Sequence, residues 1–534
     1  MTADNDDATY DYVIVGAGSA GCVLAARLSQ DPSLRVCLIE AGPVDSAENI
    51  HVPSAFSRLF RTEVDWDYAT AEEPALHGRS VYLPRGRVLG GTSSVNAMVY
   101  ARNNRRDFDE WGLAGWSYDE LLPYFRRSED NERGASYYHG AGGPLGVADG
   151  RSGNVLAAAF VEAALAAGHP ANDDFNGARQ DGFGFFQVTQ RDGRRHSTAA
   201  AYLRPAADRP NLTVRTDVRV HRVLLDGARA VGVTGRRLDE EVVVRAEREV
   251  ILCAGAYNSP QLLMLSGIGP ADQLGMFGID VALDHPEVGA NLHDHPLIPL
   301  NVTGTEPVSL LAAGTPQDVR RFAEEGRGPL TSNGPEAGGF VRTRPELPAP
   351  DVEFFAAPVM FVDSGLGLPT AHALSCGPAL LTPRSRGRVS LASADPTAKP
   401  RIEHRYFAEP EDLDTAVAAL RLAFDIAGRK PLAAWVRDVH RAPASHSDAD
   451  LKAYVRRYAH SIFHAAGSCA IGAVVDEELR VRGAQGLRVV DASVLPAAGR
   501  GQPNALVVAL AEKAADLVRG VAPLPAAQPE AATA

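Results

Sequence analysis

The chain has 534 residues, of which 45% are apolar and 22% charged, a balance typical of a globular protein built from more than one domain-sized unit. Its formal net charge of -13 argues against a nucleic-acid partner, because such a partner requires a basic surface. The five cysteines have no metal-ligand spacing, and no apolar run approaches the roughly 20 residues of a membrane span, so we expect a cytoplasmic protein without a metal site.

The first predicted elements form a strand, a helix and a second strand around a glycine-rich loop. Residues 12–15 predict a strand, GAGSAG follows at 16–21, a helix runs to about residue 28, and residues 35–39 predict the second strand. Such a unit binds a pyrophosphate at the helix N-terminus and a ribose hydroxyl on the acid that closes the second strand. The predicted dinucleotide site comprises Gly16, Gly18, Ser19, Ala20, Gly21, Glu40 and Ala41. NAD and FAD both remain open at this point, and a glycine-rich turn of another α/β fold is the alternative.

A second glycine-rich segment, GRVLGGTSSVN, occupies residues 86–96. Because Gly90 and Gly91 lack a Cβ, their backbone can lie flush against a flat ring. An ordinary surface loop is the alternative. The sequence therefore indicates a second ligand contact but does not identify the ligand.

The later part of the chain predicts a second layer and a final helix. Residues 352–355 and 389–391 read as strands and residues 412–426 as a helix, and we expect residues 301–461 to build a sheet that roofs the site. A helix is predicted from residue 504 to about 518, with Asn504 either directed at the ligand or serving only as the N-cap. Its N-terminus would stabilise a nearby anion by about 0.3 to 2 kcal/mol. The low-complexity tail, residues 522–534, is expected to be disordered.

Six segments in chain order resemble the glucose-methanol-choline (GMC) family of FAD-dependent alcohol oxidoreductases. They are the two glycine-rich segments and residues 249–269, 288–296, 463–472 and 486–496. The similarity is strongest to the choline dehydrogenase and bacterial alcohol dehydrogenase branch. It implies an α/β fold in which a discontinuous Rossmann-like FAD-binding domain carries a substrate-binding domain with an antiparallel or mixed sheet over the flavin. The implied FAD-binding domain comprises residues 8–160, 205–300 and 462–521, and the substrate-binding domain residues 161–204 and 301–461.

The resemblance also implies where FAD lies. Trp66 would lie beside the cofactor, Val220 near the adenine, and Asp491 and Ala492 at the middle of the dinucleotide. The residues implied beside the flavin ring are Gly90, Gly91, Asn96, Ala97 and Met98. Some relatives attach FAD covalently through a histidine in this loop, but Val95 stands there in this chain, so we expect non-covalent FAD.

His464 matches the catalytic histidine of the family, and Asn504 matches its partner position. The resemblance implies oxidation of a primary alcohol to an aldehyde: His464 takes the hydroxyl proton, Asn504 orients the oxygen, and the hydride goes to flavin N5. A histidine suits this role because its unperturbed pKa of about 6.5 is close to working pH. The electron acceptor, oxygen or quinone, and the oligomeric state remain open.

Several substrates and reactions also remain open. Choline oxidase holds its cationic substrate with a glutamate directly after this DHP segment, where this chain has Leu297. The net negative charge, together with the family's aminoglycoside-tailoring members, suggests an amino sugar alcohol such as paromamine; a small alcohol is the simpler alternative. A choline dehydrogenase-like enzyme and a non-redox lyase on the same FAD scaffold are further alternatives. Arg500 and Gln502 replace small residues that the family usually has before the last helix, and the sequence assigns them no role.

Overall fold

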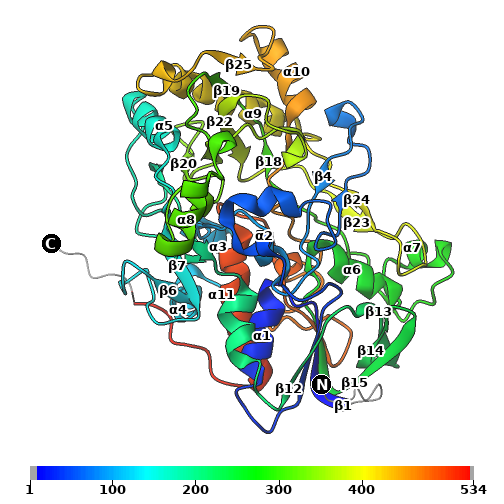
Figure 1. Cartoon of the computed structure of the whole chain (residues 1–534). Coiled ribbons are helices and arrows are strands. Elements are labelled where there is room, and N and C mark those ends of the chain that lie inside the picture. The colour runs from blue at the N-terminus through cyan, green and yellow to red at the C-terminus, as the bar shows by residue number, and fades with distance from the viewer. Residues whose placement is uncertain (1–8, 529–534) are drawn as a thin grey trace.

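A seven-stranded, mainly parallel sheet organises the nucleotide-binding half of the protein, whose computed structural model describes residues 9–528 (Figure 1). Its strands run in the order β12 (Leu212–Arg215), β2 (Val36–Ile39), β1 (Thr9–Val15), β15 (Glu240–Leu252), β14 (Arg229–Arg237) and β13 (Arg219–Asp226), and β27 (Leu487–Val489) pairs with β15. The strands β12, β2, β1, β15 and β27 pair in parallel, whereas β14 and β13 are antiparallel. The order confirms a Rossmann-like core assembled from distant parts of the chain.

Three helices form a layer beside this sheet: α1 (Ser19–Leu28) packs on β1 and β2, α11 (Pro503–Arg519) packs on α1, and α4 (Tyr118–Ser128) packs on α11. Figure 1 shows α1 and α11, from opposite ends of the chain, lying side by side. Their shared ion-pair centre is Glu512, which is fully buried and lies 2.7 Å from Arg27 Nη2 and 2.8 Å from Arg127 Nε. The helix predicted to run to about residue 28 and the helix predicted over residues 504–518 are therefore confirmed, the first ending at residue 28 and the second spanning 503–519.

The second sheet has eight strands and is antiparallel throughout its described pairs. Its order is β25 (Asp438–His440), β19 (Asn301–Gly304), β22 (His372–Leu380), β21 (Val352–Ala357), β20 (Ala337–Val341) and β8 (Gly182–Phe185), and β18 (Pro296–Leu297) joins β22 to β26 (His460–Ser461). The helices of this half are α5 (Val155–Ala166), α9 (Pro410–Ala427) and α10 (Asp448–Tyr458). They share one apolar core with the sheet, which confirms the expected second layer.

The strand predicted at residues 389–391 does not join this roof. It forms β23 (Arg388–Ser390), which pairs only with β24 (Arg401–Glu403) in a separate two-stranded sheet. The cause is a long-range contact, since the Val389 amide donates to the Gly289 carbonyl at 2.7 Å. The pair packs against α6 (Gly255–Leu265), in the nucleotide-binding half.

Two further segments lie across the predicted domain boundaries. The boundary at residue 160 falls inside α5, whose apolar side chains belong to the core of the second sheet. Residues 199–203, assigned to the substrate-binding domain, form one π-helical turn that packs against α1.

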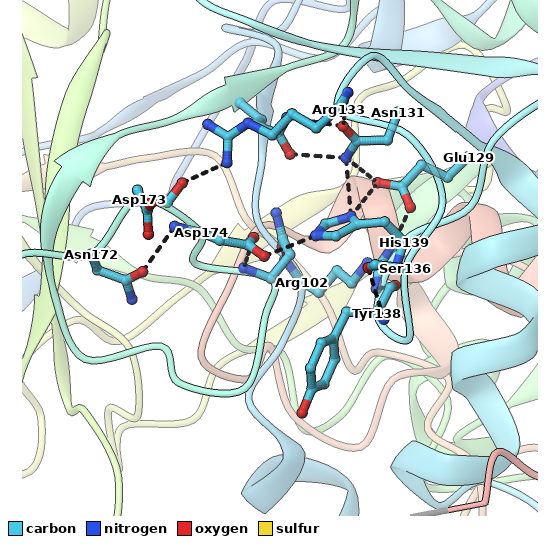
Figure 2. Close-up of polar contacts among 12 residues, drawn as sticks. Arg102, Glu129, Asn131, Arg133, Ser136, Tyr138, His139, Asn172, Asp173 and Asp174 are labelled. Carbon is cyan, nitrogen blue, oxygen red and sulfur yellow. Dashed lines mark hydrogen bonds and ion pairs between the residues drawn. The ribbon is translucent and has the colours of Figure 1, made fainter. Parts of the chain in front are cut away.

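A four-stranded sheet carries a buried network of charges (Figure 2). His139 lies 3.0 Å from both Glu129 Oε1 and Asp174 Oδ2, and Arg102 Nη2 lies 2.7 Å from Glu129 Oε2. Burial alone would lower the pKa of His139, but its hydrogen bonds to Asp174 and Glu129 raise that pKa to about 9. The strands are β5 (Val99–Tyr100), β9 (Gln187–Val188), β7 (Leu145–Asp149) and β6 (Glu129–Asn131).

The remaining elements are short. The helices are α2 (Glu48–His51), α3 (Arg105–Trp111), α7 (Ala271–Met276) and α8 (Pro316–Glu325). The strands are β3 (Tyr68–Ala69), β4 (Tyr82–Leu83), β10 (Gln190–Arg191), β11 (Arg194–Arg195), β16 (Ile268–Gly269) and β17 (Leu283–Asp284). None of the helices within residues 9–528 combines the length and apolar character needed to cross a membrane.

The structure describes residues 522–528 of the tail that the sequence predicts to be disordered. Residues 522–528 form no helix or strand, but the amides of Leu524 and Ala527 donate to the Tyr124 hydroxyl at 3.0 Å and to the Asp119 carbonyl at 2.8 Å. The rest of the predicted tail, residues 529–534, lies outside the described residues.

Candidate active site

A cavity of about 370 Å³ is lined by residues from both halves of the protein. Among the predicted site residues it brings together Gly16, Gly18, Ser19, Ala20, Glu40, Ala41, Trp66, Gly91, Asn96, Ala97, Met98, Val220, His464, Asp491, Ala492 and Asn504. Gly21 and Gly90 do not line it. A Cβ on Gly21 would lie 1.9 Å from the Gly16 carbonyl oxygen, so this glycine allows α1 to pack close to the loop. Gly90 lies behind the cavity wall, where its amide donates to the Ala17 carbonyl.

Glu40 organises the nucleotide end of the cavity. Its Oε2 accepts from the Ala17 amide and its Oε1 from the Gly42 amide, both at 2.9 Å. Burial raises the pKa of this carboxyl to about 7. A group balanced between its two protonation states near neutral pH can both accept from and donate to a ribose hydroxyl.

The second glycine-rich segment lies directly against the first. A Cβ on Gly91 would lie 2.6 Å from Gly18 Cα, so a larger residue would separate the two loops. Asn96 Oδ1 accepts from the Met98 amide at 3.1 Å and from Arg195 Nη1 at 2.8 Å, which fixes the end of the segment. The segment is thus a rigid wall of the cavity, as a flat cofactor ring requires.

The N-termini of α1 and α11 meet at the cavity. Ser19 Oγ donates to Asn504 Oδ1 at 2.6 Å, although the two residues are 485 positions apart. Asn504 is not the N-cap of α11, which is Gln502, so the capping alternative is wrong. Because its oxygen is held by Ser19, the Asn504 amide nitrogen is the group available to donate into the cavity.

His464 faces the cavity and contacts a second histidine. Its Nδ1 lies 3.0 Å from His295 Nδ1, and its backbone amide donates to Asp294 Oδ1 at 2.8 Å. Burial lowers the pKa of His464 well below its usual range, and the neighbouring His295 lowers it further. When the shared proton is on His464 Nδ1, the Nε2 atom of the neutral ring carries a lone pair and can act as a base.

Sequence reasoning did not single out His295, Asp294 or Arg85. His295 does lie in a segment that carries the family resemblance, but only the fold brings it beside His464, 169 positions away. Asp294 also accepts from the Tyr406 hydroxyl at 2.5 Å and from the Ser461 hydroxyl. Arg85 lines the cavity and donates to the carbonyl of Phe463 at 2.7 Å.

The part of the cavity lined by the roof and the Phe463 segment is mainly apolar, although Ser375, His460 and Ser461 also line it. Phe56, Phe60 and Phe463 form an edge-to-face series with ring centroids 6.0 and 6.1 Å apart. The other apolar residues of this part are Leu297, Pro335, Phe355, Val359, Phe361 and Ile462. Among the described residues, the only acids that line the cavity are Glu40 and Asp491, both at predicted cofactor positions.

Arg500 and Gln502, which the sequence left unassigned, anchor the segment before α11. Arg500 forms an ion pair with buried Asp107 on α3 and donates to the Pro350 carbonyl at 3.1 Å. Gln502 lines the cavity and its Nε2 donates to Glu353 Oε1 on β21 at 2.6 Å. Burial raises the pKa of Glu353 to about 8, so this acid is mostly protonated at neutral pH.

The residues present fit FAD. A glycine loop, a helix N-terminus and an acid lie at one end of the cavity, a rigid glycine-rich wall borders it, and a neutral histidine faces it. Fold and site together define a flavin-dependent oxidoreductase of the Rossmann type.

Comparison with known proteins supports the same class. Family models described as GMC oxidoreductase match residues 10–297 and 383–511. The chain is 42% identical to mitochondrial choline dehydrogenase of Homo sapiens, over 96% of this chain and 90% of that one. It is 41% identical to alcohol dehydrogenase [acceptor] of Pseudomonas putida, over 95% of each chain. The crystal structure of pyridoxine 4-oxidase from Mesorbium loti superposes with a TM-score of 0.87 at 33% identity, covering 95% of this chain and 98% of that one.

The chain belongs to the GMC oxidoreductase family and is an FAD-dependent alcohol oxidoreductase. Its FAD is non-covalent, in keeping with Val95 in the glycine-rich wall. The predicted family, fold class and cofactor are thereby confirmed.

Proposed function

We propose that this protein oxidises an uncharged primary alcohol to an aldehyde, with His464 as the base. The observation that carries the proposal is the 3.0 Å contact between His464 and His295 in a buried site, because it leaves one lone pair of a neutral imidazole for the substrate. Bound FAD would supply the acceptor for the hydride that leaves the carbon.

Asn504 is proposed to hold the substrate oxygen. Its amide nitrogen can donate to the developing alkoxide without competing for the proton, since its oxygen is occupied by Ser19. The N-terminus of α11 lies at the same place and favours negative charge there. His464 would therefore remove the proton while Asn504 and the helix stabilise the charge left behind.

The apolar lining favours an uncharged substrate over choline or an amino sugar. Leu297 stands on the apolar side, and the acids that line the described cavity, Glu40 and Asp491, are both at cofactor positions. An ammonium group bound on the apolar side would lose its hydration without gaining a carboxylate partner, and a quaternary ammonium would gain only the faces of phenylalanines. Sequence similarity does not separate choline from an uncharged alcohol, because choline dehydrogenase of Homo sapiens and alcohol dehydrogenase of Pseudomonas putida are 42% and 41% identical to the chain, so the choice rests on the cavity lining.

The test is anaerobic mixing of the FAD-loaded protein with aliphatic alcohols, benzyl alcohol, choline and paromamine, followed by loss of flavin absorbance. We expect the uncharged alcohols to bleach the flavin fastest. His464→Ala should slow this reduction by about 10² to 10⁴-fold while keeping its FAD, because a general base contributes that much. His446→Ala, at an exposed histidine, is the matched control.

Three outcomes would contradict the proposal. Full-rate reduction in His464→Ala would exclude this residue as the base. Turnover of a substrate without bleaching would indicate lyase chemistry instead. Faster reduction by paromamine or choline than by every uncharged alcohol would exclude the proposed substrate class. Readmission of air then shows whether oxygen restores the colour and serves as the acceptor.

A further inference from the structure

A second, smaller cavity of about 60 Å³ adjoins the active-site cavity. The two cavities share three lining residues, Pro299, Phe361 and His460, so a thin wall separates them. Phe361 and His460 contact each other with ring centroids 5.8 Å apart. A space of this size holds several waters or one small oxyanion, since a single water needs about 10 to 15 Å³.

The small cavity is positively charged, although the chain as a whole is acidic. Three arginines line it, Arg79, Arg441 and Arg457, and among its described lining residues Asp363 is the only acid. Arg441 Nη1 lies 2.9 Å from Asp363 Oδ1, so that carboxylate is already paired. The positive charges of Arg79 and Arg457 therefore have no acidic partner in this lining, in a protein whose formal net charge is -13.

Several buried nitrogen atoms in this lining have no hydrogen-bond partner among the described residues. They are Arg79 Nε, His440 Nε2 and His460 Nε2. His460 is only 5% exposed, and its Nδ1 donates to the Ser461 carbonyl at 2.8 Å, which leaves Nε2 as the unpaired atom. Buried polar atoms are almost always paired, so these three nitrogens call for polar partners in this space, either water or a bound group.

We propose that this cavity binds an oxyanion, a carboxylate or phosphate group. Arg79 Nε would donate a charge-assisted hydrogen bond, and Arg457 would add positive charge at the mouth. His440 Nε2 can donate in the neutral tautomer that carries its proton on that atom. His460 already donates through Nδ1, so its Nε2 donates only in the charged ring, which burial disfavours by lowering the pKa to about 4. The group belongs either to a free anion or to the acidic end of an alcohol whose hydroxyl reaches His464; the second source rests on the proposed function.

The first experiment is calorimetric titration of the FAD-loaded protein with inorganic phosphate and with acetate. We expect at least one anion to bind the wild type, and Arg79→Gln and Arg457→Gln to weaken that binding by about tenfold or more. Arg320→Gln removes the same charge from an exposed position on α8 and should bind like the wild type. Because Arg79 also donates to the carbonyls of Arg456 and Ala459, its variant can fail to fold; the exposed Arg457 keeps the test decisive.

The second experiment identifies the source of the anion. Flavin reduction is measured with ω-hydroxy fatty acids of increasing length and with their primary amides. If the acidic end of the substrate fills the site, one length of acid will show a lower KM than its amide in the wild type, and Arg457→Gln will abolish this preference. If only the free anions bind, acid and amide will behave alike.

The proposal is overturned if neither phosphate, acetate nor a hydroxy acid distinguishes the wild type from Arg79→Gln and Arg457→Gln. Failure of the proposed function gives a different result, because phosphate and acetate binding is measured without any oxidation. A protein that binds phosphate through Arg457 but is bleached by no alcohol would keep this site and lose the proposed reaction.

Discussion

At the scale of single residues, His464 and His295 have complementary roles in the proposed removal of the substrate proton. His464 provides the lone pair, and His295 decides which nitrogen of His464 carries the proton, because only one proton fits between two Nδ1 atoms 3.0 Å apart. Burial lowers the pKa of His295 to about 4, so its ring remains neutral and its Nδ1 can accept a hydrogen bond from His464 Nδ1.

Replacement of His295 by Gln should slow flavin reduction by roughly 10 to 100-fold, less than loss of the base itself, since the base contributes about 10² to 10⁴. His295 also lowers the pKa of His464, so the variant should raise that pKa and move the acidic limb of the rate profile to higher pH. The measurement is the reduction rate constant against pH for wild type and variant. An unchanged profile with a full rate would show that His295 does not position the base.

At the scale of elements, β21 and the start of α11 are joined by a pair that titrates. Glu353 is fully buried on β21 and has Gln502 as its hydrogen-bond donor. Burial raises its pKa in the folded state from 4.5 to about 8, so the folded protein holds this proton more tightly than the unfolded chain does. Glu353 should therefore reduce stability as the pH rises from about 4.5 to 8.

Glu353→Gln should abolish the loss of stability at rising pH, because an amide of the same shape does not titrate. We expect the Tm of the variant to exceed that of the wild type at alkaline pH and the two values to converge in acid. Thermal unfolding across this pH range measures the difference, with Glu346→Gln, an exposed acid, as the control. A Tm difference that does not change with pH would contradict a protonated Glu353.

The network around His139 also loses stability as the pH rises, but here the protonated, stabilising form is the charged one (Figure 2). The folded-state pKa of His139 is raised from 6.5 to about 9, so its contribution to stability is complete below about 6.5 and disappears as the pH rises through 9. His139→Gln should therefore lower the Tm most at mildly acidic pH and least above the raised pKa. Equal destabilisation at every pH would mean that shape, and not charge, holds the network together.

Particular elements show how far the sequence could predict the structure. The β1, α1 and β2 unit is local, so its hydrophobic periodicity and glycines predicted it within a few residues. Residues 389–391 have an equally clear strand pattern, yet their partner was fixed by a contact to Gly289 that no local pattern contains. His295 was missed for the same reason, because its role depends on a neighbour far along the chain.

At the scale of the whole molecule, the cofactor lies where both halves of the protein meet. FAD bound there should stabilise the fold, by about 2.7 kcal/mol when its free concentration is a hundred times its Kd. We expect the Tm to rise with added FAD and fall after its removal.

Because Val95 offers no atom for attachment, denaturation in acid should release all FAD into the supernatant. Flavin that stays with the precipitated chain would contradict non-covalent binding.

The hydrogen bond between Ser19 and Asn504 joins the first described helix of the fold to the last one, so the site needs both helices. Because synthesis runs from the N-terminus, the glycine loop leaves the ribosome long before α11, whose Asn504 follows Ser19 by 485 positions. A nascent or truncated chain that stops before residue 503 can fold its first strands but lacks the helix end that would stabilise the alkoxide. Such a chain also lacks Asn504, so the site becomes complete only after almost every described element has been made.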